Sequence, residues 1–208
     1  LCNLAWCHEH GKGVKQDYAQ AVRLYQAAAD QDYPRGHLSL GLCYERGRGV
    51  PADKAMAAEL YRKAAELGDE DGMCCLGFLY ESGEGVEQSW EQAVEWYQKS
   101  AEAGLPRGMC NLAWCHEHGK GVKRDLEAAF SWYKRAADQG DPRGLFSVAR
   151  AYDYGLGVVQ DPERAAKWYQ SATDAGSAPA ACDLGVCYER GEGVPQSFEK
   201  AVELYRKA

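Results

Sequence analysis

Two short segments of this sequence combine residue types that bind metal ions and act as nucleophiles. They are Cys7-His-Glu-His10 and Cys115-His-Glu-His118, each with a thiol, two imidazoles and a carboxylate. On a helix, the two histidines of one segment lie about 200° apart, whereas helical zinc sites favour ligands four residues apart. No third residue can be argued to orient a Cys–His pair for catalysis. We therefore expect no metal, no cofactor and no enzymatic activity.

The elements that position these segments belong to a repeat. The tetrapeptide Gly-x-Gly-Val occurs six times, and each copy begins 36 residues after the previous one. The copies begin at Gly11, Gly47, Gly83, Gly119, Gly155 and Gly191. Such a fixed period is typical of a solenoid, because one unit of this length cannot bury its apolar face alone.

The period divides the chain into six repeats that form a single solenoid over residues 1–208. Their bounds are 1–36, 37–72, 73–108, 109–144, 145–180 and an incomplete 181–208. Because the chain begins and ends inside a repeat, we interpret it as a piece of a longer array. Residues 2–15 are identical to residues 110–123, three repeats later, which indicates either an internal duplication or engineering.

The pattern within each repeat predicts two helices joined by a turn at Gly-x-Gly-Val, the glycine turn. In the first ten residues, positions one, four, five and eight form the apolar stripe of a helix, and position five is always glycine or alanine. The first glycine of the turn suits the left-handed conformation after a helix, and the valine can return to the core. A Leu-Tyr or Trp-Tyr pair in the second helix predicts a packing wedge. Capping residues precede that helix at Asp17, Asp53, Ser89, Asp125, Asp161 and Ser197.

Composition and charge narrow the possible partners. The formal net charge of −7 argues against nucleic acid or an anionic membrane surface as the main partner. No apolar run is long enough to cross a bilayer. The nine cysteines fall in the predicted first helices, at positions that cannot reach one another, so we expect thiols and favour a reducing compartment such as the cytoplasm.

At this point the sequence resembles the Sel1-like repeat family, which is related to the tetratricopeptide repeats. The second repeat carries the pattern most clearly, from Leu40-Gly41 through Tyr44, Gly47–Val50 and Asp53 to Gly68. The resemblance covers nearly the whole chain. It implies an all-α, right-handed α/α superhelical solenoid of helix-turn-helix repeats. It also implies an adaptor role in signalling, host interaction or protein-complex assembly.

The resemblance also implies where a partner would bind, because the outward face of the first helix lines the concave groove in related arrays. Position six lies on that face and is apolar in five of the six repeats. Exposed apolar stripes mark interaction surfaces, although a tight superhelix would bury position six against the next first helix. The predicted groove residues are Trp6, His10, Leu42, Arg46, Phe78, Arg107, Asn111, Trp114, His118, Arg143, Arg150 and Tyr154.

The function of two groups of polar and charged residues on the same face remains open. Position nine is acidic in every repeat, which fits either selection of basic peptides or a solvated surface. By analogy with a few tetratricopeptide domains, Asn111 together with Arg107, Arg143 and Arg150 could clamp a C-terminal carboxylate.

We therefore predict a scaffold that binds a protein or peptide in its groove, and we expect no small-molecule substrate. The alternative is a structural spacer or oligomerisation module without a groove ligand. A more remote alternative is hydrolase activity, as implied by a cysteine-rich branch of the family linked to β-lactams. That branch pairs cysteines of the first and second helices, and this chain has none in the second.

Overall fold

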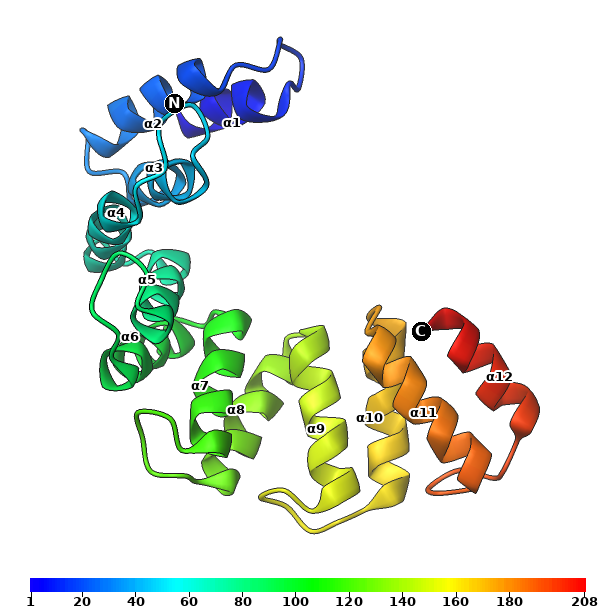
Figure 1. Ribbon diagram of the computed structural model, residues 1–208. Coiled ribbons are helices and arrows are strands. Elements are labelled where there is room, and N and C mark those ends of the chain that lie inside the picture. The colour runs from blue at the N-terminus through cyan, green and yellow to red at the C-terminus, as the bar shows by residue number, and fades with distance from the viewer. The chain divides into compact units, whose positions relative to one another are not determined.

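The structure is a computed structural model that describes all 208 residues, and it contains twelve helices and no strands (Figure 1). The helices are α1 Cys2–His10, α2 Tyr18–Ala29, α3 Pro34–Arg46, α4 Lys54–Glu66, α5 Glu70–Ser82, α6 Trp90–Glu102, α7 Pro106–His118, α8 Leu126–Asp138, α9 Pro142–Tyr154, α10 Pro162–Asp174, α11 Ala178–Arg190 and α12 Phe198–Lys207. They form consecutive helix-turn-helix pairs, which confirms the predicted all-α repeat fold.

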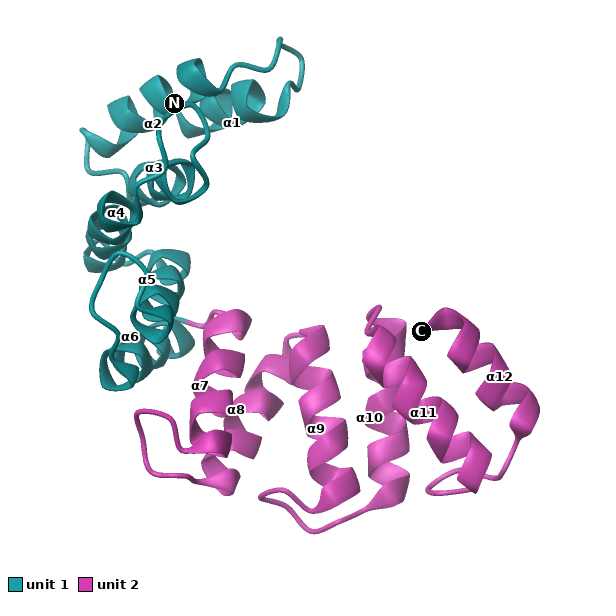
Figure 2. Ribbon diagram, viewed as in Figure 1, with its two compact units in different colours: residues 1–103 teal, residues 104–208 magenta.

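The chain divides into two compact units, Leu1–Ala103 and Gly104–Ala208, which are coloured separately in Figure 2. Each unit contains three helix pairs, and each helix packs against the next one along the chain within its unit. Within a unit, first helices of successive repeats also contact each other, α1 with α3, α3 with α5, and α7 with α9. Second helices make no comparable contact, so the first helices form the inner row of each unit.

The second helices begin where the capping residues predict. The side chain at each of the six positions accepts a hydrogen bond from a backbone N–H three residues later, as Asp17 does from Gln20 at 2.9 Å and Asp53 from Met56 at 3.0 Å. Capping residues of this kind satisfy the free amides of a first helical turn. The prediction is confirmed in α2, α4, α6, α8, α10 and α12.

The two turn glycines are needed for different reasons. The first adopts the left-handed conformation at the end of every first helix, as at Gly47 with φ 66°. The second also has positive φ, and at Gly49, Gly85, Gly157 and Gly193 it packs tightly against the second helix of the preceding repeat. A Cβ added at Gly49 would lie 2.5 Å from the carbonyl oxygen of Tyr18. Gly13, which has no preceding repeat in the chain, has nothing within 4 Å of the same point.

Where position five is glycine, at Gly41, Gly77 and Gly185, the tyrosine of the same repeat fills the space that the missing side chain leaves. A Cβ added at Gly41 would lie 2.6 Å from the Tyr61 ring, and Tyr61 is fully buried. The wedge prediction is thus correct for the tyrosine in the first five repeats. The partner tryptophans Trp96, Trp132 and Trp168 are only half-buried, and each lies beneath a lysine or arginine, such as Arg135 at 4.1 Å from the Trp132 ring centre.

The core is continuous from one repeat to the next inside a unit. One cluster joins Ala5 and Tyr25 of the first repeat to Leu40 and Leu60 of the second. Val50 of the glycine turn packs against this cluster, as predicted for the turn valine. None of the twelve helices is long and apolar enough to cross a membrane. The nine cysteines form no disulfide bond.

Candidate functional site

The residues at position six lie on the first helices but differ in exposure. Trp6 and Phe78 are 48% and 47% exposed, whereas Leu42, Trp114 and Arg150 are half-buried. The sequence left two alternatives open for position six, exposure and burial by the neighbouring helix. Trp6 and Phe78 are exposed, whereas the other three residues are partly buried.

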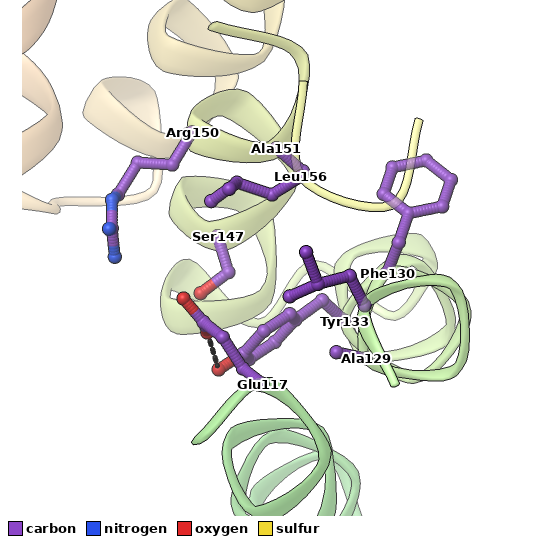
Figure 3. Close-up of a pocket in the computed structure, with 9 residues that line it drawn as sticks. Glu117, Ala129, Phe130, Tyr133, Ser147, Arg150, Ala151 and Leu156 are labelled. Carbon is purple, nitrogen blue, oxygen red and sulfur yellow. Dashed lines mark hydrogen bonds between the residues drawn. The ribbon is translucent and has the colours of Figure 1, made fainter. Parts of the chain in front are cut away.

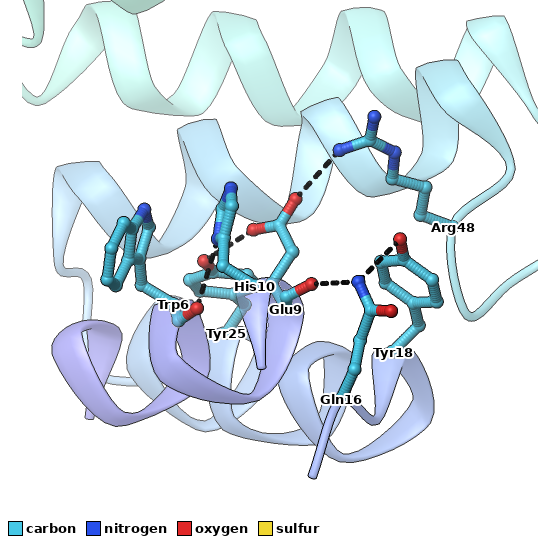
Figure 4. Close-up of polar contacts among 7 residues, drawn as sticks. All are labelled: Trp6, Glu9, His10, Gln16, Tyr18, Tyr25 and Arg48. Carbon is cyan, nitrogen blue, oxygen red and sulfur yellow. Dashed lines mark hydrogen bonds and ion pairs between the residues drawn. The ribbon is translucent and has the colours of Figure 1, made fainter. Parts of the chain in front are cut away.

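Two of the predicted histidines pack on the tryptophan one turn earlier. The ring centres of Trp6 and His10 are 4.6 Å apart and stacked, and Trp114 and His118 repeat this arrangement at 4.4 Å. In both pairs the histidine Nδ1 lies 3.0 Å from the tryptophan carbonyl oxygen, as Figure 4 shows for the first pair. Each pair therefore presents one joined aromatic surface rather than two separate side chains.

The acidic residues at position nine have a structural role that was not predicted from the sequence. They are Glu9, Glu45, Glu81, Glu117, Asp153 and Glu189. In every repeat the carboxylate at position nine accepts a hydrogen bond from the hydroxyl of the tyrosine sixteen residues later, which is buried in the first five repeats. Glu9 accepts from Tyr25 at 2.9 Å and also from Arg48 at 3.2 Å (Figure 4). Each of these carboxylates therefore joins the two helices of its repeat, and both functional interpretations of the acidic residues stay open.

A second contact attaches the segment that follows the glycine turn to the position-nine residue, Glu9 in the first repeat. The side chain of Gln16 donates to the backbone carbonyl of Glu9 at 2.8 Å and to the Tyr18 hydroxyl at 2.9 Å (Figure 4). Gln88, Arg124, Gln160 and Gln196 make the equivalent bond to a position-nine carbonyl. The recurrence of a long amide or guanidinium side chain immediately before the cap was the sequence signal for this contact.

One groove runs across three first helices of the second unit. It has a volume of about 440 Å³ and is bordered by α7, α9 and α11. Its apolar wall includes Trp114, Phe146 and Pro179, and its polar groups include Arg143 and Arg150. Four of the predicted groove residues therefore meet here, namely Trp114, His118, Arg143 and Arg150. Phe146 was not predicted, although it lies one turn before Arg150 on the same helix.

The two arginines of α9 have different surroundings. The Arg143 guanidinium donates to the Asn111 side-chain oxygen at 2.9 Å, so two members of the predicted carboxylate clamp are already bound to each other. Arg150 makes no hydrogen bond or ion pair. Arg107 lies on the exposed first turn of α7, and the exposed Tyr154 ends α9. The structure thus brings two members of the predicted clamp, Asn111 and Arg143, into contact.

The remaining predicted residues lie in the first unit. Trp6, His10, Leu42, Arg46 and Phe78 come from α1, α3 and α5, and Arg46 is exposed at the end of α3. Unit 1 carries a separate hollow of about 430 Å³ beside the start of α1, lined by Cys2, Asn3, Tyr33 and Arg35 among others.

A small cavity adjoins the groove from the side of α8 (Figure 3). Its volume is about 10 Å³, which is room for about one water molecule. Figure 3 shows the Glu117–Tyr133 hydrogen bond beside Ser147, with the Arg150 guanidinium apart from it. This cavity is too small for a ligand, so the open groove is the stronger candidate site.

The thiols and imidazoles have no arrangement typical of a reactive centre. No three histidine, cysteine or acidic side chains are grouped as metal ligands. Burial raises the pKa of Cys43 and of Cys187 to about 11, which disfavours the nucleophilic thiolate. His8 and His116 are half-buried in the place of tyrosine, and the Nδ1 atom of each has no hydrogen-bond partner.

The repeated caps, turns and wedges define a Sel1-type solenoid, and comparison with known proteins agrees. The Sel1 repeat profile matches residues 1–33, 34–69, 71–105, 106–141, 142–177 and 178–208, so the chain belongs to the Sel1 repeat family. No curated protein sequence matches the chain.

Solved structures give the same fold. A Sel1 repeat protein from Oxalobacter formigenes is 33% identical with a TM-score of 0.93, over 98% of this chain and 84% of that one. The protective antigen c5321 of uropathogenic Escherichia coli is 36% identical with a TM-score of 0.90, and the match covers 99% of this chain. The match spans only 44% of the antigen's length. Immunity protein Pa5087 from Pseudomonas aeruginosa, at 17% identity and a TM-score of 0.63 over 98% of this chain and 80% of its own, shares the fold alone.

Proposed function

We propose that this chain is a non-enzymatic scaffold that binds a protein or peptide partner through its first helices. The observation that carries the proposal is the groove over α7, α9 and α11, where aromatic side chains and two arginines line one open surface. Tryptophan and arginine are the residue types that dominate binding energy at protein interfaces.

The groove suits a polypeptide better than a small molecule. It is open along its length and crosses three helices, whereas sites for small ligands enclose most of the ligand surface. The net charge of −7 favours a protein partner over nucleic acid. Because a hydroxyl–carboxylate hydrogen bond joins the two helices of each repeat, binding would require little ordering of the scaffold.

Sel1 repeats generally mediate protein interactions, and the process served here lies in signalling, host interaction or complex assembly. The E. coli relative is a protective antigen, which keeps host interaction among these processes. The chain has no disulfide bond, which is compatible with a reducing compartment.

Affinity capture tests this proposal with a matched pair of variants. Trp114→Ala with Phe146→Ala removes the apolar wall of the groove, whereas Trp132→Ala with Trp168→Ala removes the same kind of surface from the second helices. Partners captured by the native chain should be lost with the first variant and kept with the second, both being checked for helical content by circular dichroism. Equal capture by all three proteins would place binding outside the groove, and no capture by any would favour a spacer.

A further inference from the structure

One face of α9 carries two positive charges with an aromatic ring between them. Arg143, Phe146, Ser147 and Arg150 follow the i, i+3, i+4, i+7 spacing that places residues on one side of a helix, and all four line the groove. The two arginine Cα atoms are separated by about 10 Å along the helix axis, given a rise of about 1.5 Å per residue.

The positive charge of this face is only partly balanced inside the groove, where two arginines face one carboxylate. Arg143 is bound to the uncharged side chain of Asn111, and Arg150 has no partner. The one carboxylate among the groove residues, Glu117, is bound to the Tyr133 hydroxyl at 3.0 Å. Asp183 lies near enough for Arg150 to oppose the rise that burial causes in its pKa, but the two form no ion pair. A chain of net negative charge thus has a locally positive groove.

The first unit provides a comparison, because its residues align with those of the second unit 108 positions later. The stripe of α3 equivalent to that of α9 reads Arg35, Leu38, Ser39 and Leu42. Leu42 takes the place of Arg150, so the second positive charge is missing.

Arg35, the one arginine of the α3 stripe, has an acidic residue nearby, as Arg150 does. Burial raises the carboxyl pKa of Asp69 and Arg35 opposes part of that rise, as Arg150 does for Asp183, and neither arginine forms an ion pair with that residue. The residue equivalent to Asp69 in the second unit is the uncharged Ser177, which lines the groove. The helices α1 and α7 share the identical segment of residues 2–15 and 110–123, so the difference in charge comes from the helices that face them.

From this placement we infer that the groove of the second unit binds an acidic peptide segment, in which an apolar side chain is flanked by two aspartate or glutamate residues. The apolar side chain would pack against Phe146 and Trp114, while the flanking carboxylates would pair with Arg143 and Arg150. Arginine binds carboxylates in bidentate geometry, which gives such a site direction as well as affinity. This inference rests on the proposed function and names the chemistry of its partner.

Selection from a random twelve-residue peptide library, displayed without a free C-terminus, tests the inference directly on the full chain. Peptides that bind should be enriched in Asp or Glu on both sides of an apolar residue, and their affinity should fall as salt is raised. A selected peptide would then be titrated against Arg150→Leu, Arg150→Lys and the double variant Arg150→Leu with Leu42→Arg. The double variant keeps the net charge and moves the arginine to the equivalent position of the first unit.

The expected result is about tenfold weaker binding for Arg150→Leu and for the double variant, and a smaller loss for Arg150→Lys, which keeps the charge but not the bidentate geometry. If the double variant binds as well as the native chain, only overall charge matters and the inference is overturned. It is also overturned if neutral or basic peptides are selected, or if binding requires a free C-terminal carboxylate, although the proposed function would stand. If no peptide binds at all, the inference is overturned, whereas the proposed function is decided separately by the affinity capture with the Trp114→Ala, Phe146→Ala variant.

Discussion

The Tyr61 hydroxyl donates a hydrogen bond to the Glu45 carboxylate at 2.9 Å, and the same pair recurs in all six repeats. Tyr61 is fully buried, so this bond joins the second helix of its repeat to the end of the first in an environment of low polarity. Since the bond has a charged acceptor, Tyr61→Phe should lower the free energy of unfolding by about 1.5–3 kcal/mol.

The equivalent tyrosine of the last repeat is a natural control. Tyr205 makes the same bond to Glu189 at 2.6 Å, but it is 37% exposed. Water can replace the lost bond there, so Tyr205→Phe should have the smaller effect in urea unfolding. Equal effects of the two substitutions would show that burial does not strengthen the pair.

Alkaline pH should weaken the same contacts. Burial is the main cause that raises the pKa of Tyr61, and the hydrogen bond to Glu189 is the main cause that raises the pKa of Tyr205 to about 12. A folded-state pKa above the unfolded value of about 10 means that the native state holds its proton more tightly. The contribution of these tyrosines to stability should therefore be constant below pH 10 and fall above it. Thermal melts between pH 8 and pH 11 that show no decline would contradict this account.

The second turn glycine provides a test of repeat stacking. Gly49 and Gly13 have nearly the same positive φ, 76° and 74°, but only Gly49 lies against the preceding repeat. Gly13→Ala should lower stability by about 1–2 kcal/mol through the left-handed backbone alone. Gly49→Ala should lower it further, because the new Cβ would contact the Tyr18 carbonyl oxygen and force the backbone to move. Comparable melting temperatures for the two variants would indicate that the turn does not support stacking.

His37 should make stability depend on mildly acidic pH. Its imidazole is buried, both ring nitrogens lack hydrogen-bond partners, and burial and Lys63 lower its pKa while Asp32 and Asp30 oppose this. The unfolded chain therefore takes up the proton first, so stability should decline as pH falls below about 6.5. His37→Met, which introduces the residue of the third and fourth repeats, should remove that part of the pH dependence. Parallel curves for the two proteins between pH 7 and pH 5 would rule out a role for His37.

Thiol reactivity should separate the cysteines by position. Cys182 is exposed, whereas Cys43 and Cys187 are buried and have pKa values raised to about 11. A disulfide reagent at pH 8 should modify Cys182 first and the other two only as the chain unfolds. Peptide mapping after brief labelling gives the order, and early modification of Cys43 would contradict the packing of that repeat.

Most of the fold could be predicted from the sequence because each local pattern recurs in all six repeats. The period, the left-handed glycine after each first helix and the capping Asp or Ser all depend on neighbours along the chain. The pairing of position nine with the tyrosine could not be predicted in this way. It depends on how two helices cross, which brings residues sixteen positions apart into contact.

The candidate site was predicted only in part for the same reason. Trp114, His118, Arg143 and Arg150 were expected on the first-helix face, and they do line one groove. Phe146 was missed because it occupies a position that is apolar or small in other repeats and reads as core. The hydrogen bond between Arg143 and Asn111 was also missed, since it joins the successive first helices α7 and α9 rather than residues of one helix.

The most direct test of the groove as a binding surface is site-specific photo-crosslinking to a captured partner. A photoreactive phenylalanine analogue would replace Phe146 in the groove, and in a separate protein it would replace Trp132 on the second helices. We predict a covalent adduct with the partner from position 146 and none from position 132. An adduct from position 132 alone would contradict the central claim that the first helices hold the partner.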